Sequence, residues 1–322
     1  MSVSFKVLKN EDDLLRMSVE GIDVEIKGII AKSQGMLNAI ALGVLYSATA
    51  DVICVCGESG TGKEMLFRAI RQASSKSSAV CVNCGAMTET LLESELFGHK
   101  KGSFTDAVSD RRGAFLEAGD GFLFLDEIGE MTPRGQSKLL RAIEYKEIKA
   151  VGSDVSVQHK AKVVLATNRD LMELISDGKF RRDLYYRIEG FKIELPPLRE
   201  RADDIESLVK YFSGNTYKFS KEVMNSLMKH DWPGNVRELK NAIERAKIRS
   251  LYGERTITWD MLGISKELKR DDGKKATLEE MERRIVEEAF TRCDFNISST
   301  SRALGLPRST LYSKLKKHSL IS

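Results

Sequence analysis

The sequence predicts an α/β fold in which a parallel sheet carries helices on both faces and smaller helical regions follow it. Short, nearly continuous apolar runs alternate with longer helical patterns between about Val52 and Leu195. Strands that are buried on both faces of a parallel sheet have such runs, and helices connect them. The four clearest runs are Val52–Cys56, Ala79–Val82, Phe122–Leu125 and Val163–Ala166.

The strand pattern ends at Leu195-Pro196-Pro197, and charged segments with a 3.6-residue period run from Ala202 to about Leu262. This change predicts a small helical domain after the sheet. Residues 264–275 are charged and nearly free of apolar residues, which is typical of a linker. We therefore expect a short N-terminal segment at 1–26, the α/β region at 27–195, the helical region at 196–262, a linker at 263–275 and a separate helical domain at 276–322.

The composition is that of a globular protein. A chain of 322 residues with 42% hydrophobic content can bury the cores of two domains or more. The formal net charge is only +4, so any contact with nucleic acid must come from a local basic patch. Because the sequence contains neither a membrane-length apolar run nor a signal peptide, we expect a cytoplasmic protein without a membrane partner.

Four of the five cysteines have a spacing that also occurs in zinc sites. Cys54 and Cys56 are followed by Cys81 and Cys84. Both pairs fall in or beside predicted strands, where a free cysteine serves as a small hydrophobic side chain. We favour this interpretation over a metal site.

A glycine-rich loop follows the first predicted strand and opens a helix, which is the setting of a phosphate-binding loop. Its glycines let backbone N–H groups face phosphates, and Lys63 offers a cation to the β and γ oxygens. The alternative is an ordinary glycine turn between a strand and a helix. The loop consists of Gly57, Glu58, Ser59, Gly60, Thr61, Gly62, Lys63 and Glu64.

Two carboxylates end a second strand, at the edge of the sheet where ligands of parallel folds bind. Asp126 and Glu127 follow the apolar residues Gly121–Leu125. We expect Asp126 to hold Mg²⁺, directly or through water, and Glu127 to polarise the attacking water. Such a pair can also serve only to stabilise a helix N-terminus, but the combination with Lys63 favours ATP hydrolysis.

A series of longer motifs resembles the NtrC-type bacterial enhancer-binding proteins, which activate sigma-54-dependent transcription. The resemblance extends from about Ile29 to the C-terminus and implies an AAA+ ATPase core, a helical lid and a Fis-type helix-turn-helix. In this family, Glu is the ordinary residue at the position of Glu64. The matching segments are Gly57–Glu64, Leu91–His99, Leu123–Ile128, Phe180–Arg187, Leu195–Arg201 and Trp232–Leu239.

The resemblance implies roles for residues that local patterns do not identify. Asn83 corresponds to a switch that senses the nucleotide through Glu127. Thr167 and Asn168 correspond to the first sensor, and Arg237 corresponds to the second sensor. Arg181 and Arg187 resemble arginine fingers that act on the γ-phosphate of the adjacent subunit, so hydrolysis would require a ring. Taken singly, each arginine could also be an ordinary solvated side chain.

The family couples hydrolysis to transcription through a loop whose usual sequence is Gly-Ala-Phe-Thr-Gly-Ala. Here the loop reads Gly102, Ser103, Phe104, Thr105, Asp106 and Ala107. Phe104 and Thr105 resemble the residues that contact sigma-54. Ser103 is a small change, whereas Asp106 adds a charge and removes the positive-φ freedom of glycine. We predict that the contact with sigma-54 survives these changes.

The C-terminal end is basic and resembles the DNA-binding unit of Fis. Between Asn296 and Ser322 the chain has basic residues and no Asp or Glu. Ile297–Leu304 and Pro307–Lys317 are predicted as the two helices, with Leu311 and Leu315 in the core. A helical hairpin that docks on protein is the alternative. Bases would be met by Arg308, Ser309 and Thr310, and phosphates by Lys314, Lys316 and Lys317. Arg302 is a further residue expected to bind DNA.

These features predict a sigma-54-dependent activator that uses ATP and Mg²⁺. Its expected partners are the sigma-54 RNA polymerase holoenzyme, double-stranded DNA at an upstream site, and copies of itself that assemble from dimers to a hexamer. Many relatives carry a receiver or sensor domain before the motor, and we expect none in the short N-terminal segment. The competing hypotheses are a DNA-binding regulator that acts without sigma-54 and, in a different class, an AAA+ unfoldase or helicase.

Overall fold

The computed structural model forms two compact units, Met1–Ile264 and Ser265–Ser322. It describes residues 3–11, 14–74, 78–105, 107–214, 216–250, 255–264, 283, 286–287, 289–290, 293 and 296–318. Within these residues, no helix is long and apolar enough to cross a membrane.

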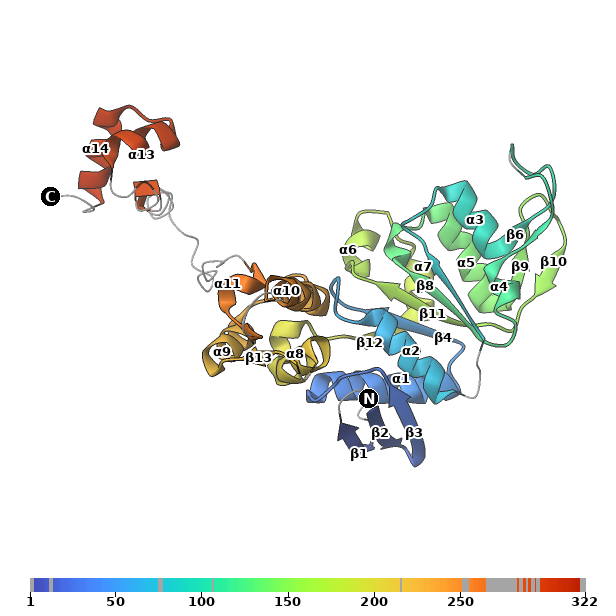
Figure 1. Ribbon diagram of the computed structural model, residues 1–322. Coiled ribbons are helices and arrows are strands. Elements are labelled where there is room, and N and C mark those ends of the chain that lie inside the picture. The colour runs from blue at the N-terminus through green and yellow to red at the C-terminus, as the bar shows by residue number, and fades with distance from the viewer. Residues whose placement is uncertain are drawn as a thin grey trace. The chain divides into compact units, whose positions relative to one another are not determined.

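A five-stranded parallel sheet forms the centre of the first unit (Figure 1). The strand order is β12-β4-β11-β8-β5, and all four neighbouring pairs are parallel. The four strands predicted from the apolar runs are therefore present, and the predicted fold class is confirmed. The strands are β4 (Val52–Cys56), β5 (Ala79–Asn83), β8 (Phe122–Asp126), β11 (Lys162–Thr167) and β12 (Lys192–Glu194).

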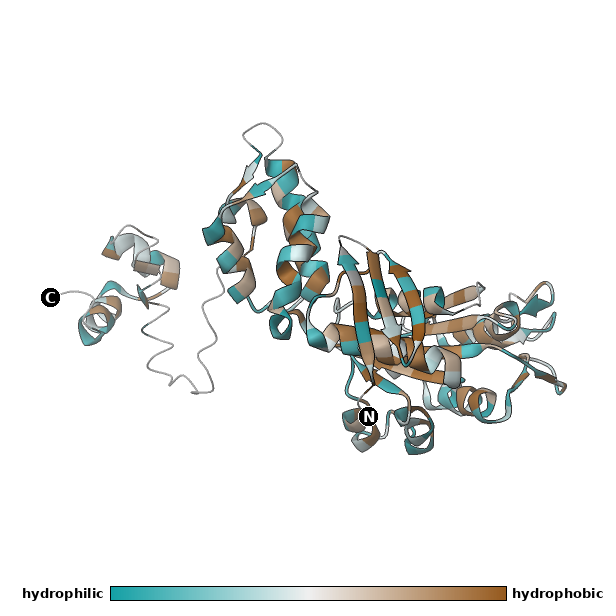
Figure 2. Ribbon diagram, turned by 90° about the horizontal axis from the view of Figure 1, so that it is seen from below, coloured by the Kyte–Doolittle hydropathy of each residue, from teal (hydrophilic) through white to brown (hydrophobic). Residues whose placement is uncertain are grey.

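Both faces of the sheet are buried, which explains why the strands are apolar at nearly every position. Val52 and Cys54 of β4 belong to the core on one face, whereas Ile53 and Val55 belong to the core on the other. Hydrophobic residues, brown in Figure 2, run along the strands. The surrounding elements are α1 (Gln34–Thr49), α2 (Lys63–Ala73), α3 (Glu89–Phe97), α4 (Ala114–Glu117), α5 (Pro133–Tyr145), α6 (Leu171–Ser176), α7 (Arg182–Glu189) and the 3-10 turn η1 (Ile128–Glu130).

The N-terminal segment folds as a three-stranded antiparallel sheet, which the sequence reading did not predict. Its strands are β1 (Phe5–Glu11), β2 (Leu14–Val19) and β3 (Ile22–Lys27), in the order β1-β2-β3. Glu20 and Gly21 both have positive φ, 47° and 82°, and form the tight turn between β2 and β3. Leu15, Met17 and Ile26 are fully buried, so this sheet is part of the core that includes α1 and α2.

The helical lid follows Pro197 and has its own hydrophobic core around Trp232. Trp232 is fully buried and its Nε1 donates a hydrogen bond of 2.8 Å to Leu227 O. One short parallel strand pair, β13 (Lys218–Phe219) with β14 (Thr256–Ile257), departs from the all-helical prediction. The other lid elements are η2 (Leu198–Glu200), η3 (Ala202–Asp204), α8 (Ile205–Ser213), α9 (Lys221–Lys229), α10 (Asn235–Arg249) and α11 (Trp259–Leu262).

A small antiparallel pair, β6 (Gly98–His99) and β7 (Arg111–Arg112), carries the loop at 100–110. A second hairpin, β9 (Glu147–Lys149) with β10 (Ser156–Gln158), lies beside it, because His99 bridges to Val151. Both project at the same end of the α/β region in Figure 1.

In the described residues from 296 to 318, the second unit has two helices joined by a short turn. These are α13 (Ile297–Leu304) and α14 (Arg308–Lys317). Gly305, with a φ of 63°, ends α13, and Leu311 and Leu315 are fully buried in the core of this unit. The predicted helix-turn-helix is therefore present, with Pro307 immediately before the second helix rather than within it.

Candidate active site

The phosphate-binding loop connects β4 to α2, as predicted. Its glycines at 60 and 62 have φ values of 78° and 109°, in the region that favours glycine. Nζ of Lys63 donates hydrogen bonds to Gly57 O at 2.7 Å and to Glu58 O at 3.0 Å. Burial lowers the pKa of Lys63, and the nearby Asp126 carboxylate opposes that change. The ammonium group is thus held within the loop, beside an acidic neighbour.

One cavity of about 960 Å³ brings most of the predicted nucleotide residues together. It is lined by Ser59–Glu64 of the loop, by Asp126 and Glu127, by Asn168 and by Arg237 of the lid. The cavity is also lined by residues that no sequence pattern indicated. These are Gly28, Ile29 and Ile30, which precede α1, and Leu208, Tyr211 and Phe212 of α8. A cavity of this volume, lined by the glycine loop and by apolar side chains, is large enough for a nucleotide.

Asp126 ends β8 at the cavity, directly beside β5. The two strands pair Asn83 with Asp126, and Cys84 N donates to Asp126 O at 2.9 Å. Burial raises the pKa of Asp126, although the Glu127 N–H, which donates to its Oδ1 at 3.0 Å, opposes this. A cation placed next to this carboxylate would stabilise its ionised form.

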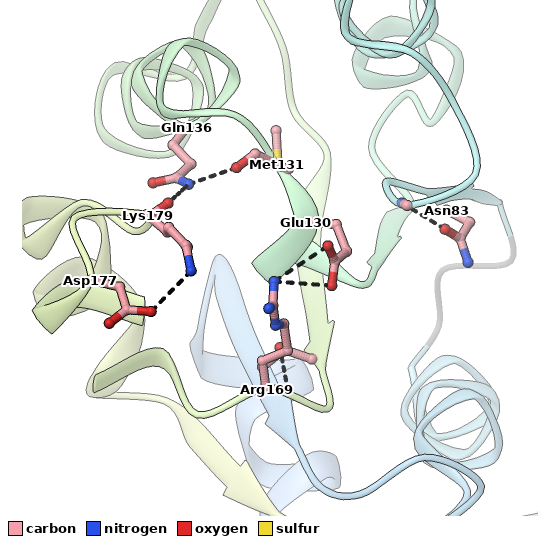
Figure 3. A network of polar contacts seen from close by, with 9 residues as sticks. Asn83, Glu130, Met131, Gln136, Arg169, Asp177 and Lys179 are labelled. Atoms are coloured by element: carbon pink, nitrogen blue, oxygen red, sulfur yellow. Dashed lines mark hydrogen bonds and ion pairs between the residues drawn. The ribbon is translucent and has the colours of Figure 1, made fainter. Parts of the chain in front are cut away.

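Glu127 and Asn83 are neighbours across Gly85. A Cβ added to Gly85 would stand 2.5 Å from Oε2 of Glu127 and 3.5 Å from Oδ1 of Asn83. The same Asn83 oxygen accepts a hydrogen bond of 2.8 Å from Gly85 N, shown in Figure 3. Glu127 itself has a φ of 57°, an uncommon backbone conformation for a residue other than glycine.

The two predicted residues of the first sensor lie in different surroundings. Thr167 is fully buried at the end of β11, and its carbonyl accepts a hydrogen bond from Gly57 N at 3.2 Å. Asn168 is exposed and lines the cavity. Next to it, Arg169 forms an ion pair of 3.3 Å with Glu130, also drawn in Figure 3.

Neither Arg181 nor Arg187 lines the cavity of its own chain. Both are exposed on or beside α7. Arg181 pairs with Asp183 at 2.6 Å, and its Nη1 donates to Ser137 Oγ at 2.9 Å. A single subunit therefore does not bring the two arginines to the nucleotide residues.

Gln136 positions the backbone at Arg181, which the sequence did not indicate. This side chain is fully buried. Its Nε2 donates to Met131 O and to Lys179 O, both at 2.8 Å, as Figure 3 shows. Its Oε1 accepts a hydrogen bond of 2.8 Å from Arg181 N. Because two of the three partners lie more than 40 residues further along the chain, no local pattern marks the residue.

The loop at 102–107 is folded against the α/β region. The Phe104 ring packs edge-on against His99, with ring centroids 4.9 Å apart. Ser103 lies against Gly152, where a Cβ would stand 2.6 Å from the Cβ of Ser103. Thr105 is exposed, Ala107 is buried, and Asp106 lies outside the described residues.

The base of this loop is held by Asp110. Its carboxylate accepts hydrogen bonds from Lys100 Nζ at 2.5 Å and from Lys101 N at 2.8 Å. The Lys100 ammonium, and after it the Lys101 N–H, lowers the pKa of Asp110.

The cysteine interpretation needs one correction. Cys54 and Cys84 are buried, as expected for small hydrophobic residues, but Cys81 is exposed and lines the nucleotide cavity. The reason is that β5 is one of the two edge strands of the sheet, so no further strand covers its outer side. In the part of the chain that the structure describes, no group of three or more His, Cys, Asp and Glu side chains could hold a metal ion.

The basic side chains of the second unit are mostly on its surface. Arg302, Arg308, Ser309, Lys316 and Lys317 are exposed, and Thr310 and Lys314 are partly exposed. Arg308 and Ser309 open α14, and the lysines lie toward its end. A helix with this distribution presents its N-terminus and one flank to solvent, as a major-groove helix must.

Three family profiles match consecutive parts of the chain. The Sigma-54 interaction domain matches residues 29–194, the AAA+ ATPase lid domain matches residues 199–280, and the profile "Bacterial regulatory protein, Fis family" matches residues 277–318.

Similar proteins include several transcription regulators. The transcriptional regulatory protein ZraR of Klebsiella oxytoca is 40% identical over 307 residues, covering 90% of this chain and 69% of that protein. The Nif-specific regulatory protein of Azotobacter vinelandii is 42% identical over 268 residues, covering 80% of this chain and 50% of that protein. A crystal structure of NtrX from Brucella abortus in complex with ATP is similar with a TM-score of 0.68 and 30% identity, covering 90% of this chain and 69% of that one.

Proposed function

This chain belongs to the sigma-54 interaction domain family of AAA+ ATPases, and we propose that it hydrolyses ATP as a ring of identical subunits to open promoter DNA bound by sigma-54 RNA polymerase. The observation that carries the proposal is that one cavity is lined together by Ser59–Glu64 of the glycine loop, Asp126, Glu127, Asn168 and Arg237. Because its partners are DNA and RNA polymerase, the chain would work in the bacterial cytoplasm.

ATP would bind with its base against Ile29, Ile30 and the lid, and with its phosphates on the glycine loop. The backbone N–H groups of Gly60–Lys63 and the start of α2 favour negative charge at that point. Lys63 would neutralise part of the charge on the β- and γ-phosphates.

Mg²⁺ would be held by Asp126, directly or through water. A partly buried carboxylate at the mouth of the glycine loop, with a raised pKa, has the donor chemistry that Mg²⁺ prefers. When bound, the ion would neutralise part of the negative charge of the phosphates. Glu127 would orient the attacking water and accept hydrogen bonds from it, and Asn83 would hold Glu127 in or out of position.

Arg181 and Arg187 would act on the nucleotide of the adjacent subunit. They are exposed and lie away from their own cavity, which supports action between subunits. A guanidinium group supplied by a neighbour stabilises the charge that develops on the γ-phosphate. Hydrolysis would then require assembly from dimers to a hexamer.

The loop Gly102–Ala107 would contact sigma-54, with Phe104 and Thr105 as the contacting residues. The base of the loop is ordered by Asp110, and the packing of Phe104 on His99 keeps the loop close to the α/β region. Movement away from His99 would expose the Phe104 ring to sigma-54. The second unit would place the ATPase near the promoter by binding an upstream DNA site.

A binding experiment tests this assignment. With Mg²⁺ and a transition-state mimic of the γ-phosphate, the chain should elute together with sigma-54 from a sizing column, and the Thr105→Ala variant should not. Failure of the unsubstituted chain to retain sigma-54, while it still hydrolyses ATP, would contradict the sigma-54 assignment of the loop.

A further inference from the structure

Glu58 is an acidic residue in the phosphate-binding loop, so its side chain must have a different role from those of its neighbours. A carboxylate next to a triphosphate would repel it. The loop residues that line the nucleotide cavity begin at Ser59, and Glu58 is not among them. Its carboxylate instead meets the lid.

Arg199 of η2 binds this carboxylate with both of its terminal nitrogens. Nη1 donates to Oε2 at 2.9 Å, and Nη2 donates to Oε1 at 2.6 Å. The planar two-point pairing fixes the direction of both groups as well as their distance. The Arg199 guanidinium, and after it the Asn235 amide, lowers the pKa of Glu58.

Asn235 extends the same connection into the protein interior. It is fully buried, with a φ of 52°, at the start of α10. Its Nδ2 donates to Oε2 of Glu58 at 3.1 Å and to Ser59 O at 3.0 Å. Its Oδ1 accepts from Leu198 N at 2.7 Å. The Asn235 amide thus connects the glycine loop, at Glu58 and Ser59, to the first residue of η2, Leu198.

The next two residues of α10 also contact the loop. Val236 N donates to Gly60 O at 3.0 Å, and Nη1 of Arg237 donates to Ser59 Oγ at 3.0 Å. The position of Arg237 at the cavity therefore depends on how firmly the start of α10 stays on the loop.

We propose that Glu58 and Arg199 form a lid latch: the pair holds the lid on the phosphate-binding loop, positions Arg237 at the nucleotide and slows the release of ADP. The lid latch rests on the proposed nucleotide site. Because the lid residues Tyr211, Phe212 and Arg237 line the cavity, the bound nucleotide leaves only as fast as these walls separate. Glu58 and Arg199 act as positioning residues, since their contacts are with each other and with the lid.

The exposure of the pair makes the lid latch sensitive to salt. The two side chains retain 42% and 41% of their accessible surface, so dissolved ions screen their attraction. The release of ADP from the unsubstituted chain should therefore accelerate as ionic strength rises. Loss of either charge should remove most of that dependence.

The test is a double-mutant cycle on the full chain with ADP that carries a fluorescent N-methylanthraniloyl group. Stopped-flow release rates are measured for the unsubstituted chain, Glu58→Gln, Arg199→Gln and the double variant, between roughly 50 and 500 mM salt. We expect each single substitution to accelerate release about 5- to 10-fold at low salt, and the double variant to be no faster than the quicker single one. Both single variants should also lose most of the salt dependence of ADP release.

Glu25→Gln is the matched control. Glu25 forms an equally close and exposed pair with Arg16, 2.7 Å apart, on the N-terminal sheet. It should leave the release rate and its salt dependence unchanged, which shows that surface charge in general is not responsible.

Three results would overturn the lid latch. They are multiplicative effects of the two substitutions, unchanged release in both single variants, and a salt dependence that survives in Glu58→Gln. If the unsubstituted chain bound no fluorescent ADP, or if Lys63→Ala bound it equally well, the nucleotide site itself would be wrong. That outcome is therefore distinguishable from a failure of the lid latch alone.

Discussion

Gly60→Ala tests how closely the lid must sit on the phosphate-binding loop. Gly60 has a φ of 78°, and an added Cβ would stand 2.4 Å from Gly234 O and 3.1 Å from the Cβ of Arg237. Real Cβ contacts essentially never fall below 3.0 Å, so the lid backbone must move away by at least about 0.6 Å. If the lid moves as a body, the hydrogen bond from Val236 N to Gly60 O lengthens from 3.0 Å to about 3.6 Å and is lost.

Gly60→Ala should lower the free energy of unfolding for two reasons. A non-glycine residue at this φ costs roughly 1–2 kcal/mol, and the lost hydrogen bond costs about 1 kcal/mol. We therefore expect the free energy of unfolding to fall by about 2–3 kcal/mol and the affinity for ATP to fall at least about tenfold, because Arg237 moves with the lid. Urea unfolding followed by circular dichroism and titration with fluorescent ATP measure the two effects.

Gly119→Ala is the control for backbone strain alone. Gly119 has a φ of 61°, and nothing lies within 4 Å of the position that its Cβ would take. This variant should lose about 1 kcal/mol of stability and bind ATP normally. If Gly60→Ala behaved like Gly119→Ala in both assays, the close contact between lid and loop would not matter for binding, and the reasoning would be refuted.

Three further predictions concern the other sites. Arg187→Ala and Lys63→Ala should each be inactive alone and should regain ATPase activity when mixed. In the mixture, one subunit supplies an intact glycine loop and its neighbour supplies the arginine. If no activity returned, Arg187 would act within its own subunit. Arg308→Ala should lower the affinity for the upstream DNA about tenfold in fluorescence anisotropy and leave the melting temperature unchanged. Leu311→Ala, by contrast, should lower the free energy of unfolding of the second unit by about 2–4 kcal/mol, because Leu311 is buried in its core. Asp110→Asn should weaken retention of sigma-54 about threefold on a sensor surface and leave ATP turnover unchanged, since it loosens only the base of the loop.

Local patterns in the sequence predicted the parts of the fold that are buried on both sides. The strands β4, β8 and β11 are apolar at nearly every position, and the glycine loop has its own spacing, so both are visible in a single stretch of chain. The strand β5 was predicted from its apolar run as well, although it lies at the edge of the sheet and leaves Cys81 exposed. The N-terminal sheet was missed because its strands are buried on one face only. The signal was present in the alternation of Ile22–Lys27 and in the Glu20-Gly21 turn.

The contacts that assemble the site were not predictable in the same way. Glu58 and Arg199 are separated by 141 positions, and Gln136 and Arg181 by 45, so no periodicity connects them. The sequence identified Glu58 as part of a motif but could not say that its carboxylate binds the lid. Only the family resemblance, and no local pattern, indicated that Arg181 and Arg187 act outside the cavity of their own chain, which neither of them lines.

The most direct test of the account is open-complex formation on a promoter that has an upstream binding site. Permanganate footprinting should detect melted DNA only when the chain, hydrolysable ATP and sigma-54 RNA polymerase are all present, and Glu127→Gln should bind ATP without melting DNA. The Asp106→Gly variant should melt the promoter as well as the unsubstituted chain does. Melting with the sigma-70 polymerase alone, or equal melting by Glu127→Gln, would contradict an ATP-driven activator of sigma-54 transcription.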